Sequence, residues 1–149
     1  MMTINSVVLD SDYEHRVPLL AVLRELGQHR IWIARDVGRA LHLLEMSHHD
    51  NWCLVEPLGP IQAVFVRMSL SGGFDGERLM RAVKDLDRER KWQTFVVGVM
   101  DDWDTERACR SMKFDWRLRS PVNLDDAATV IHEMTKKTLP DPLSGVICL

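Results

Sequence analysis

The sequence predicts an α/β fold in which helices cover both faces of a doubly wound sheet of five parallel strands. Two observations lead to this prediction. Short apolar runs alternate five times with segments whose apolar residues recur at helical spacing. The chain also contains no internal repeat. Alternation of this kind favours parallel strands that are joined by right-handed helical crossovers.

The first strand is predicted at residues 6–9, a short and β-branched apolar run. Asp12 can cap the helix that follows, and Gly27 can end this helix in a left-handed conformation. Pro18 leaves two possibilities, because proline disrupts the interior of a helix. Either the regular helix starts near Val17, or the helix bends at the proline.

The second unit pairs a strand at residues 30–34 with a helix that Asp36 caps and that runs through Leu44. A long connection with two prolines follows at residues 47–60. The third strand is then predicted at residues 62–66, where the chain is again apolar.

The third helix is predicted to start at Asp75, and its outer face carries charged residues at a spacing that suits weak ion pairs. The fourth strand follows at residues 94–99 and leads to a helix over roughly 105–112. The fifth strand is predicted at residues 115–118, and Asn123 caps the last helix.

The length of 149 residues suits one domain, which we assign to residues 1–135. Residues 136–149 hold two prolines and a glycine, a composition that predicts a C-terminal tail or linker. Net charge is −3, so the chain lacks the basic character of proteins that bind nucleic acid directly. No signal peptide or membrane-spanning run is present, which predicts a cytoplasmic protein that does not bind membranes.

Five segments, in this order along the chain, resemble the response-regulator receiver family across residues 6–135. They are an acidic end of the first strand (9–12), a second-helix entry (34–41), a Gly-Phe-Asp-Gly turn (73–76), a fourth strand (96–99) and a basic-then-proline turn (119–122). The resemblance implies a CheY-like, flavodoxin-like sheet of strand order 2-1-3-4-5. In that order, the crevice lies at the carboxyl ends of strands one and three.

Receiver domains transfer a phosphoryl group to an aspartate, next to a magnesium ion that two acids hold and beside a hydroxyl and a lysine. The resemblance places the acceptor at Met68 by ungapped counting from Gly76, or at Arg67 if the loop has one extra residue. Only the first acid matches the family among the positions of this vestigial phosphorylation pocket, which are Asp10, Ser11, Arg67, Met68, Gly98 and Ser120. The resemblance therefore implies a degenerate pseudo-receiver.

The favoured function is a regulatory module that acts through protein–protein contact without phosphorylation and is not an enzyme. It would control a protein partner or an attached output domain in a transcriptional or signalling protein. The alternative is a small-ligand or divalent-metal sensor that uses the same crevice. Arg67 is expected to pair with Asp10 or Asp101 if its side chain enters this crevice.

No metal or cofactor is predicted. One loop holds two adjacent histidines, an acid and a cysteine, but structural zinc sites need four regularly spaced ligands. These residues are His48, His49, Asp50 and Cys53. Four further acids could meet at the crevice, namely Asp10, Asp12, Asp101 and Asp102. We favour helix capping by Asp12 and Asp102 over metal binding.

Tryptophan and arginine gather near the predicted fourth helix and fifth strand, and both types are enriched at protein interfaces. The candidate interface residues are Trp103, Arg107, Arg110, Trp116, Arg117 and Arg119. Acidic residues on the last helix can oppose these arginines in a two-fold contact. The sequence therefore predicts a homodimer.

Overall fold

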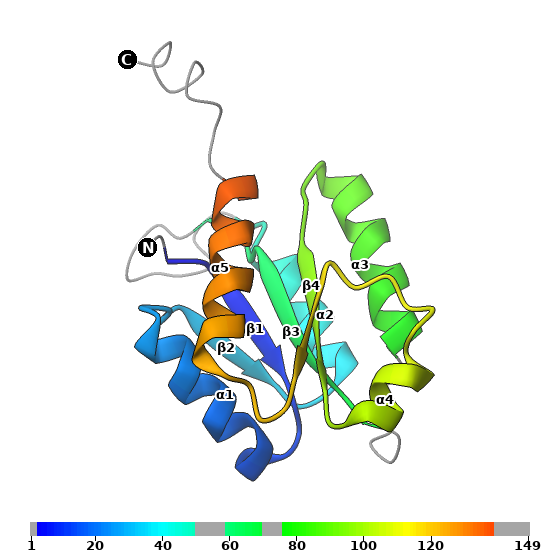
Figure 1. Ribbon diagram of the computed structural model, residues 1–149. Helices are drawn as coiled ribbons and strands as arrows, with labels where there is room; N and C mark the ends of the chain where they lie inside the picture. The colour runs from blue at the N-terminus through cyan, green and yellow to red at the C-terminus, as the bar shows by residue number, and fades with distance from the viewer. Residues whose placement is uncertain (1–2, 50–58, 70–75, 139–149) are drawn as a thin grey trace.

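The computed structural model describes residues 3–49, 59–69 and 76–138. Five strands form one parallel sheet with the order β2-β1-β3-β4-β5, as predicted (Figure 1). The strands are β1 (Ser6–Leu9), β2 (Ile31–Ala34), β3 (Ala63–Met68), β4 (Phe95–Met100) and β5 (Trp116–Arg119). The helices are α1 (Tyr13–Glu25), α2 (Val37–Met46), α3 (Gly76–Arg90), α4 (Trp103–Ala108) and α5 (Leu124–Thr138).

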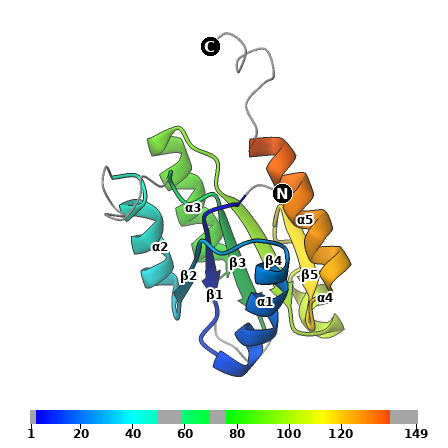
Figure 2. The same ribbon diagram turned by 90° about the vertical axis from the view of Figure 1, so that its left-hand side faces the viewer.

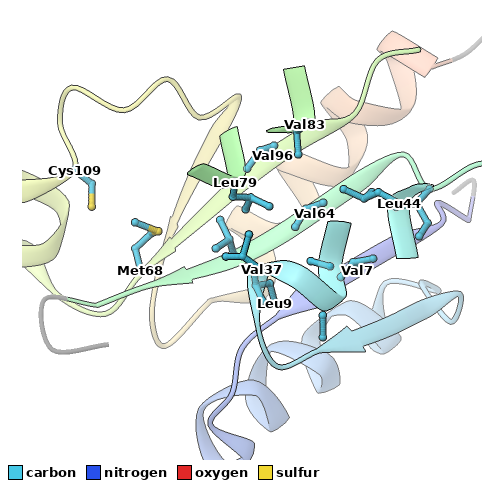
Figure 3. Close-up of a cluster of buried hydrophobic side chains, with 14 of the residues drawn as sticks. Val7, Leu9, Val37, Leu44, Val64, Met68, Leu79, Val83, Val96 and Cys109 are labelled. Carbon is cyan, nitrogen blue, oxygen red and sulfur yellow. The ribbon is translucent and has the colours of Figure 1, made fainter. Parts of the chain in front are cut away.

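Two apolar layers enclose the sheet, because successive side chains of a strand point to opposite faces. On one face, α1 and α5 pack against residues such as Val8 and Phe65. On the other face, α2 and α3 pack against residues such as Val7 and Val64 (Figures 1, 2 and 3). The three central strands are buried on both faces, which explains their continuous apolar runs.

Side-chain caps start four of the helices at the predicted residues. Asp12, Asp36 and Asn123 accept hydrogen bonds from backbone N–H groups in the first turns of α1, α2 and α5. Asp102 caps α4 in the same way. The predicted cap Asp75 lies outside the described residues.

The first helix ends at the predicted glycine, but it starts before Val17, which was one of the two predicted possibilities. Gly27 has a φ of 80°, the left-handed conformation that glycine adopts readily after a helix. The helix begins at Tyr13, so a regular start near Val17 is wrong. Pro18 lies inside the helix.

The ends of several elements differ from the prediction by one to four residues. Strand β3 continues two residues further, because Arg67 and Met68 pair with β4. Helix α4 spans Trp103–Ala108 rather than 105–112, since the Asp102 cap starts it early. Helix α5 continues to Thr138 and so includes three residues that we had assigned to the tail. Within the described ranges, every helix is too short or too polar to cross a bilayer.

Candidate functional site

A cluster of charged side chains lies where β1, β3 and β4 reach their carboxyl ends. Asp10 follows β1, Arg67 lies near the end of β3, and Asp101 follows β4. Helix α1 begins at the same edge of the sheet and adds Asp12 and His15 (Figure 1). We call these five residues the carboxyl-end cluster. The topology brings them together, because parallel strands end at the same edge.

Arg67 is the centre of the carboxyl-end cluster. Its guanidinium donates two hydrogen bonds to the carboxylate of Asp101, from Nε at 2.9 Å and from Nη2 at 3.0 Å. This two-pronged geometry is the strong form of an arginine–carboxylate pair. Nη1 lies 3.4 Å from Asp12 Oδ2 and 3.7 Å from Asp10 Oδ1. The expected pairing of Arg67 with the crevice acids is confirmed.

Asp10 is the most buried acid of the cluster, with 1% of its surface exposed. Its Oδ1 accepts a hydrogen bond from the backbone N–H of Asp12 at 2.9 Å. Its Oδ2 lies 2.5 Å from Nδ1 of His15, so the two side chains are hydrogen-bonded. Arg16 donates to the carbonyl oxygen of Asp10 at 3.2 Å. A buried carboxylate is costly unless it is paired, and these contacts provide the pairing.

His15 joins the two deeper acids and was not identified from the sequence. Its Nε2 lies 3.1 Å from Asp101 Oδ1, but the angle does not make a hydrogen bond. A sequence signal for this residue does exist. The Asp12 cap fixes His15 in the first turn of α1, and helical side chains point back toward the N-terminus, where Asp10 lies.

Two groups of the cluster have shifted pKa values. Burial alone would raise the pKa of Asp101, but hydrogen bonds from Arg67 and Ser69 and the charge of Arg67 hold it below its usual value. The hydrogen bond to Asp101 raises the pKa of Arg67 against an opposing effect of burial. Both shifts favour the charged forms, so the pair remains ionised in the folded protein.

Met68 and Arg67 point to opposite faces of the sheet, as neighbours on a strand must. Met68 is buried in the apolar layer under α2 and α3, together with Cys109 (Figure 3). Its methyl group lies 2.8 Å from where a Cβ on Gly76 would be. Placing Met68 in the crevice was therefore wrong, and the side chain that enters the crevice from β3 is Arg67.

Gly98 does not line the crevice either. It pairs with Val66 in the sheet interior, and a Cβ at this position would lie 2.6 Å from the Met100 methyl group and 2.9 Å from the Phe114 ring. Both neighbours pack on the α2 and α3 side of the sheet. The prediction placed Gly98 in the pocket from its position along the chain. That position alone does not determine which face of the sheet the residue takes.

The two serines of the predicted pocket lie at its margins. Ser11 is exposed between Asp10 and Asp12. Ser120 follows β5, and its backbone N–H donates to the carbonyl oxygen of Met100 at 2.8 Å. Of the predicted pocket residues, the structure thus brings only Asp10 and Arg67 into direct ionic contact.

Among the candidate interface residues, Arg117 turns inward. Its Nη2 donates hydrogen bonds to three backbone carbonyl oxygens just after α4. These belong to Cys109 at 3.0 Å, Arg110 at 3.2 Å and Met112 at 2.6 Å. The side chain therefore holds the segment between α4 and β5 in place. Trp116 is half-buried in the core layer of α1 and α5.

The surface of α4 is more open. Trp103 is 64% exposed, although the guanidinium carbon of Arg119 lies 3.1 Å from the centre of its ring. Arg119 also contacts Glu106 at 2.5 Å. Arg107 pairs with Asp104 on the helix surface. Trp103, Arg107 and Arg110 are thus the exposed members of the candidate interface.

No metal-binding geometry is present in the described part of the chain. There, no group of three or more histidines, cysteines and acids could hold an ion. Asp50 and Cys53 lie outside the described residues. His48 stacks edge-on against Trp92, with 5.8 Å between the ring centres. Burial lowers the pKa of His48, and the nearby Arg90 lowers it further.

Comparisons with known proteins show one consistent architecture. No protein-family model and no curated protein sequence matches the chain. Among solved structures, this chain is similar to a chain of a Saccharomyces cerevisiae complex. That complex joins the histidine phosphotransfer protein Ypd1 to the receiver domain of the response regulator Ssk1. That alignment has a TM-score of 0.69 and 15% identity and covers 94% of each chain.

Two bacterial structures are similar to the same extent. A two-component response regulator from Legionella pneumophila gives a TM-score of 0.67 at 14% identity, covering 90% of this chain and 99% of that one. A receiver-domain protein from Clostridium thermocellum gives 0.67 at 17% identity, covering 90% and 95%. The chain therefore has the fold of CheY-like response-regulator receiver domains.

Proposed function

We propose that this domain is a regulatory module that works without phosphorylation and acts through protein–protein contact. One observation supports this most strongly. Arg67 fills the crevice at the point where the receiver family presents its acceptor aspartate, and it pairs there with Asp101, Asp12 and Asp10. A guanidinium cannot accept a phosphoryl group, and its positive charge takes the place that a magnesium ion would need.

The surroundings of Arg67 also favour one fixed state. Asp10 is held by His15 and by backbone N–H, so few of its lone pairs remain for a metal ion. Asp12 uses one oxygen to cap α1 and turns the other toward Arg67. A phosphorylation switch needs two populated states with different contacts. These ion pairs stabilise a single arrangement instead.

The proposed contact surface is the exposed part of α4, which includes Trp103, Arg107 and Arg110. A receiver fold without a switch is useful only if some surface is always able to bind. We propose a homodimer through this surface, with a protein partner or attached output domain as the target of regulation. Arg117 is unsuitable for testing the dimer, because its side chain holds the chain after α4.

Sedimentation velocity tests both parts of this proposal. We expect a dimer whose dissociation constant does not change when magnesium and beryllofluoride, a phosphoryl mimic, are added. Replacing Trp103 with alanine should weaken the dimer by about 2 kcal/mol, the usual loss for an exposed tryptophan at the centre of an interface. The matched control is Tyr13→Ala, which removes an equally exposed aromatic from α1.

A monomer at high concentration would remove the homodimer. A dissociation constant that responds to beryllofluoride would contradict phosphorylation independence. The two results are distinct, so each part of the proposal can fail separately.

A further inference from the structure

Residues of α3 and of the segment that links α4 to β5 line a groove. Helix α3 lies on the opposite side of the sheet from α1 and α5 (Figure 1). The volume of the groove is about 280 Å³. None of the carboxyl-end cluster residues lines it. The groove is therefore a separate feature that the proposed pseudo-receiver function does not explain.

Methionines form the floor of this groove. Met80 of α3 and Met112 of the linking segment are half-buried, and both pack against the apolar core layer. The Met112 methyl group comes within 2.5 Å of where a Cβ on Gly76 would be, which ties the linking segment to the start of α3. Methionine side chains are flexible and polarizable, so such a floor adapts to an apolar side chain of varied shape.

Positive charge surrounds the floor. Arg81 and Lys84 lie three residues apart on α3, one helical turn, and Lys113 faces them from the linking segment. All three side chains are exposed. Among the described residues, none of the three has an ion-pair partner.

This lack of pairing differs from what the sequence suggests for α3. Glu77 and Arg81 have the spacing of an ion pair but do not form one. An ion pair between described residues of α3 joins Arg88 to Asp85, further along the helix. The cations of the groove are therefore available to an outside group, while the apolar floor lies between them.

We propose that this groove binds an acidic protein segment that carries a large apolar side chain. The apolar side chain would enter the methionine floor, and carboxylates on either side of it would contact Arg81, Lys84 and Lys113. This inference deepens the proposed function, because it gives the chemistry of a protein partner. It remains independent of the crevice, which shares no residue with the groove.

The chemistry of the groove favours a protein over a nucleic acid. A phosphodiester backbone would contact the cations of the rim but would gain nothing from the methionine floor. Exposed cations around an apolar centre suit instead the anatomy of a protein interface, which has a hydrophobic core and a polar rim.

The test uses the whole chain with isotope-labelled methionine methyl groups and follows them by NMR. The probe is a short peptide in which one leucine is flanked on both sides by glutamates. Two control peptides replace the leucine with alanine or the glutamates with lysines. We expect the glutamate–leucine peptide to shift the Met80 and Met112 methyl signals selectively, and increasingly less as salt is raised.

Charge reversal gives the matched variants. Lys84→Glu combined with Lys113→Glu should weaken peptide binding about tenfold or more, since two rim contacts become repulsive. Arg24→Glu reverses an exposed charge on α1, on the other face of the sheet, and should leave binding unchanged. Unchanged backbone amide spectra would show that each variant is folded.

Several results would overturn the proposal. These are no methyl shift at roughly millimolar peptide, an equal response to the alanine or lysine peptides, or tighter binding of a single-stranded oligonucleotide. Concentration-dependent shifts of Met80 and Met112 without any peptide would show that a second copy of this chain fills the groove instead. None of these results bears on phosphoryl transfer, so a failure here is distinguishable from a failure of the pseudo-receiver proposal.

Discussion

The carboxyl-end cluster and the α3 groove both gather charged residues, but they use them differently. In the cluster, Arg67 contacts three acids and His15 contacts Asp10. In the groove, Lys84 and Lys113 form no ion pair with an acid among the described residues, although Glu77 lines the same groove. The cluster is nearly closed to solvent at Asp10, whereas the groove cations are exposed.

If the groove binds a partner as we propose, this difference separates stability from recognition within one domain. Charges that are paired and partly buried fix the fold, because removing either partner leaves the other unsatisfied. Exposed and unpaired charges add little to stability but remain able to bind a partner. The crevice that switches state in the receiver family would then be a structural element in this chain, and the working surfaces would lie elsewhere.

The largest expected effect comes from removing the centre of the cluster. Arg67→Ala leaves Asp10 and Asp101 without their counter-charge. The Arg67 side chain is 21% exposed and that of Asp101 is 19% exposed, so the cost falls between the values for exposed and buried pairs. We expect a loss of about 2–3 kcal/mol in the free energy of unfolding, measured by urea denaturation.

The matched control is Arg88→Ala, which breaks an exposed pair with Asp85 on α3. This change should cost less than about 0.5 kcal/mol. Equal and small losses for both variants would mean that the Arg67 contacts do not stabilise the fold.

A smaller effect should follow from losing His15. His15→Ala removes the side-chain partner of Asp10 Oδ2 while Arg67 and the Asp12 N–H remain nearby. The expected loss is about 1–2 kcal/mol, the cost of leaving a buried acceptor partly unsatisfied. His132→Ala, at an exposed position of α5, serves as the control and should leave the unfolding free energy within about 0.5 kcal/mol.

The smallest effect concerns pH. Because the pKa of Asp101 is lowered in the folded protein, its contribution to stability is complete above the pKa of the unfolded chain and is lost as pH falls through the folded pKa. We therefore expect the stability difference between wild type and Asp101→Asn to shrink between about pH 5 and pH 2.

The comparison with Asp101→Asn is needed because another acid acts in the opposite direction. Burial raises the pKa of Asp87, despite hydrogen bonds from Thr94. Asp87 is present in both proteins, so its contribution cancels in the difference. A difference that stays constant or grows on acidification would contradict the role assigned to the Arg67–Asp101 pair.

The order of the elements could be predicted from the sequence because it depends on patterns within short segments, whereas the strand order followed from the resemblance to the receiver family. Apolar runs, helical spacing and caps such as Asp36 and Asn123 are local features. Ends of elements were less accurate, because they depend on neighbours. Strand β3 extends to Met68 only because β4 offers pairing partners there.

The site was predicted only in part, because strand ends can be predicted from local patterns but the face that each residue takes cannot. Asp10 and Arg67 could be placed in one crevice from strand ends alone, and the structure shows them together. Met68 and Gly98 were misplaced, because the face that each residue takes depends on register across the sheet. His15 was missed because its role arises from the direction of a helical side chain rather than from a motif.

The central claim is that the crevice cannot take a phosphoryl group, and intact-protein mass spectrometry after incubation with acetyl phosphate and magnesium tests it most directly. With Arg67 in the crevice and Met68 buried on the other face, we predict an unchanged mass. A receiver domain that has an acceptor aspartate provides the positive control. A stable gain of one phosphoryl group on an acidic residue of this chain would contradict the account.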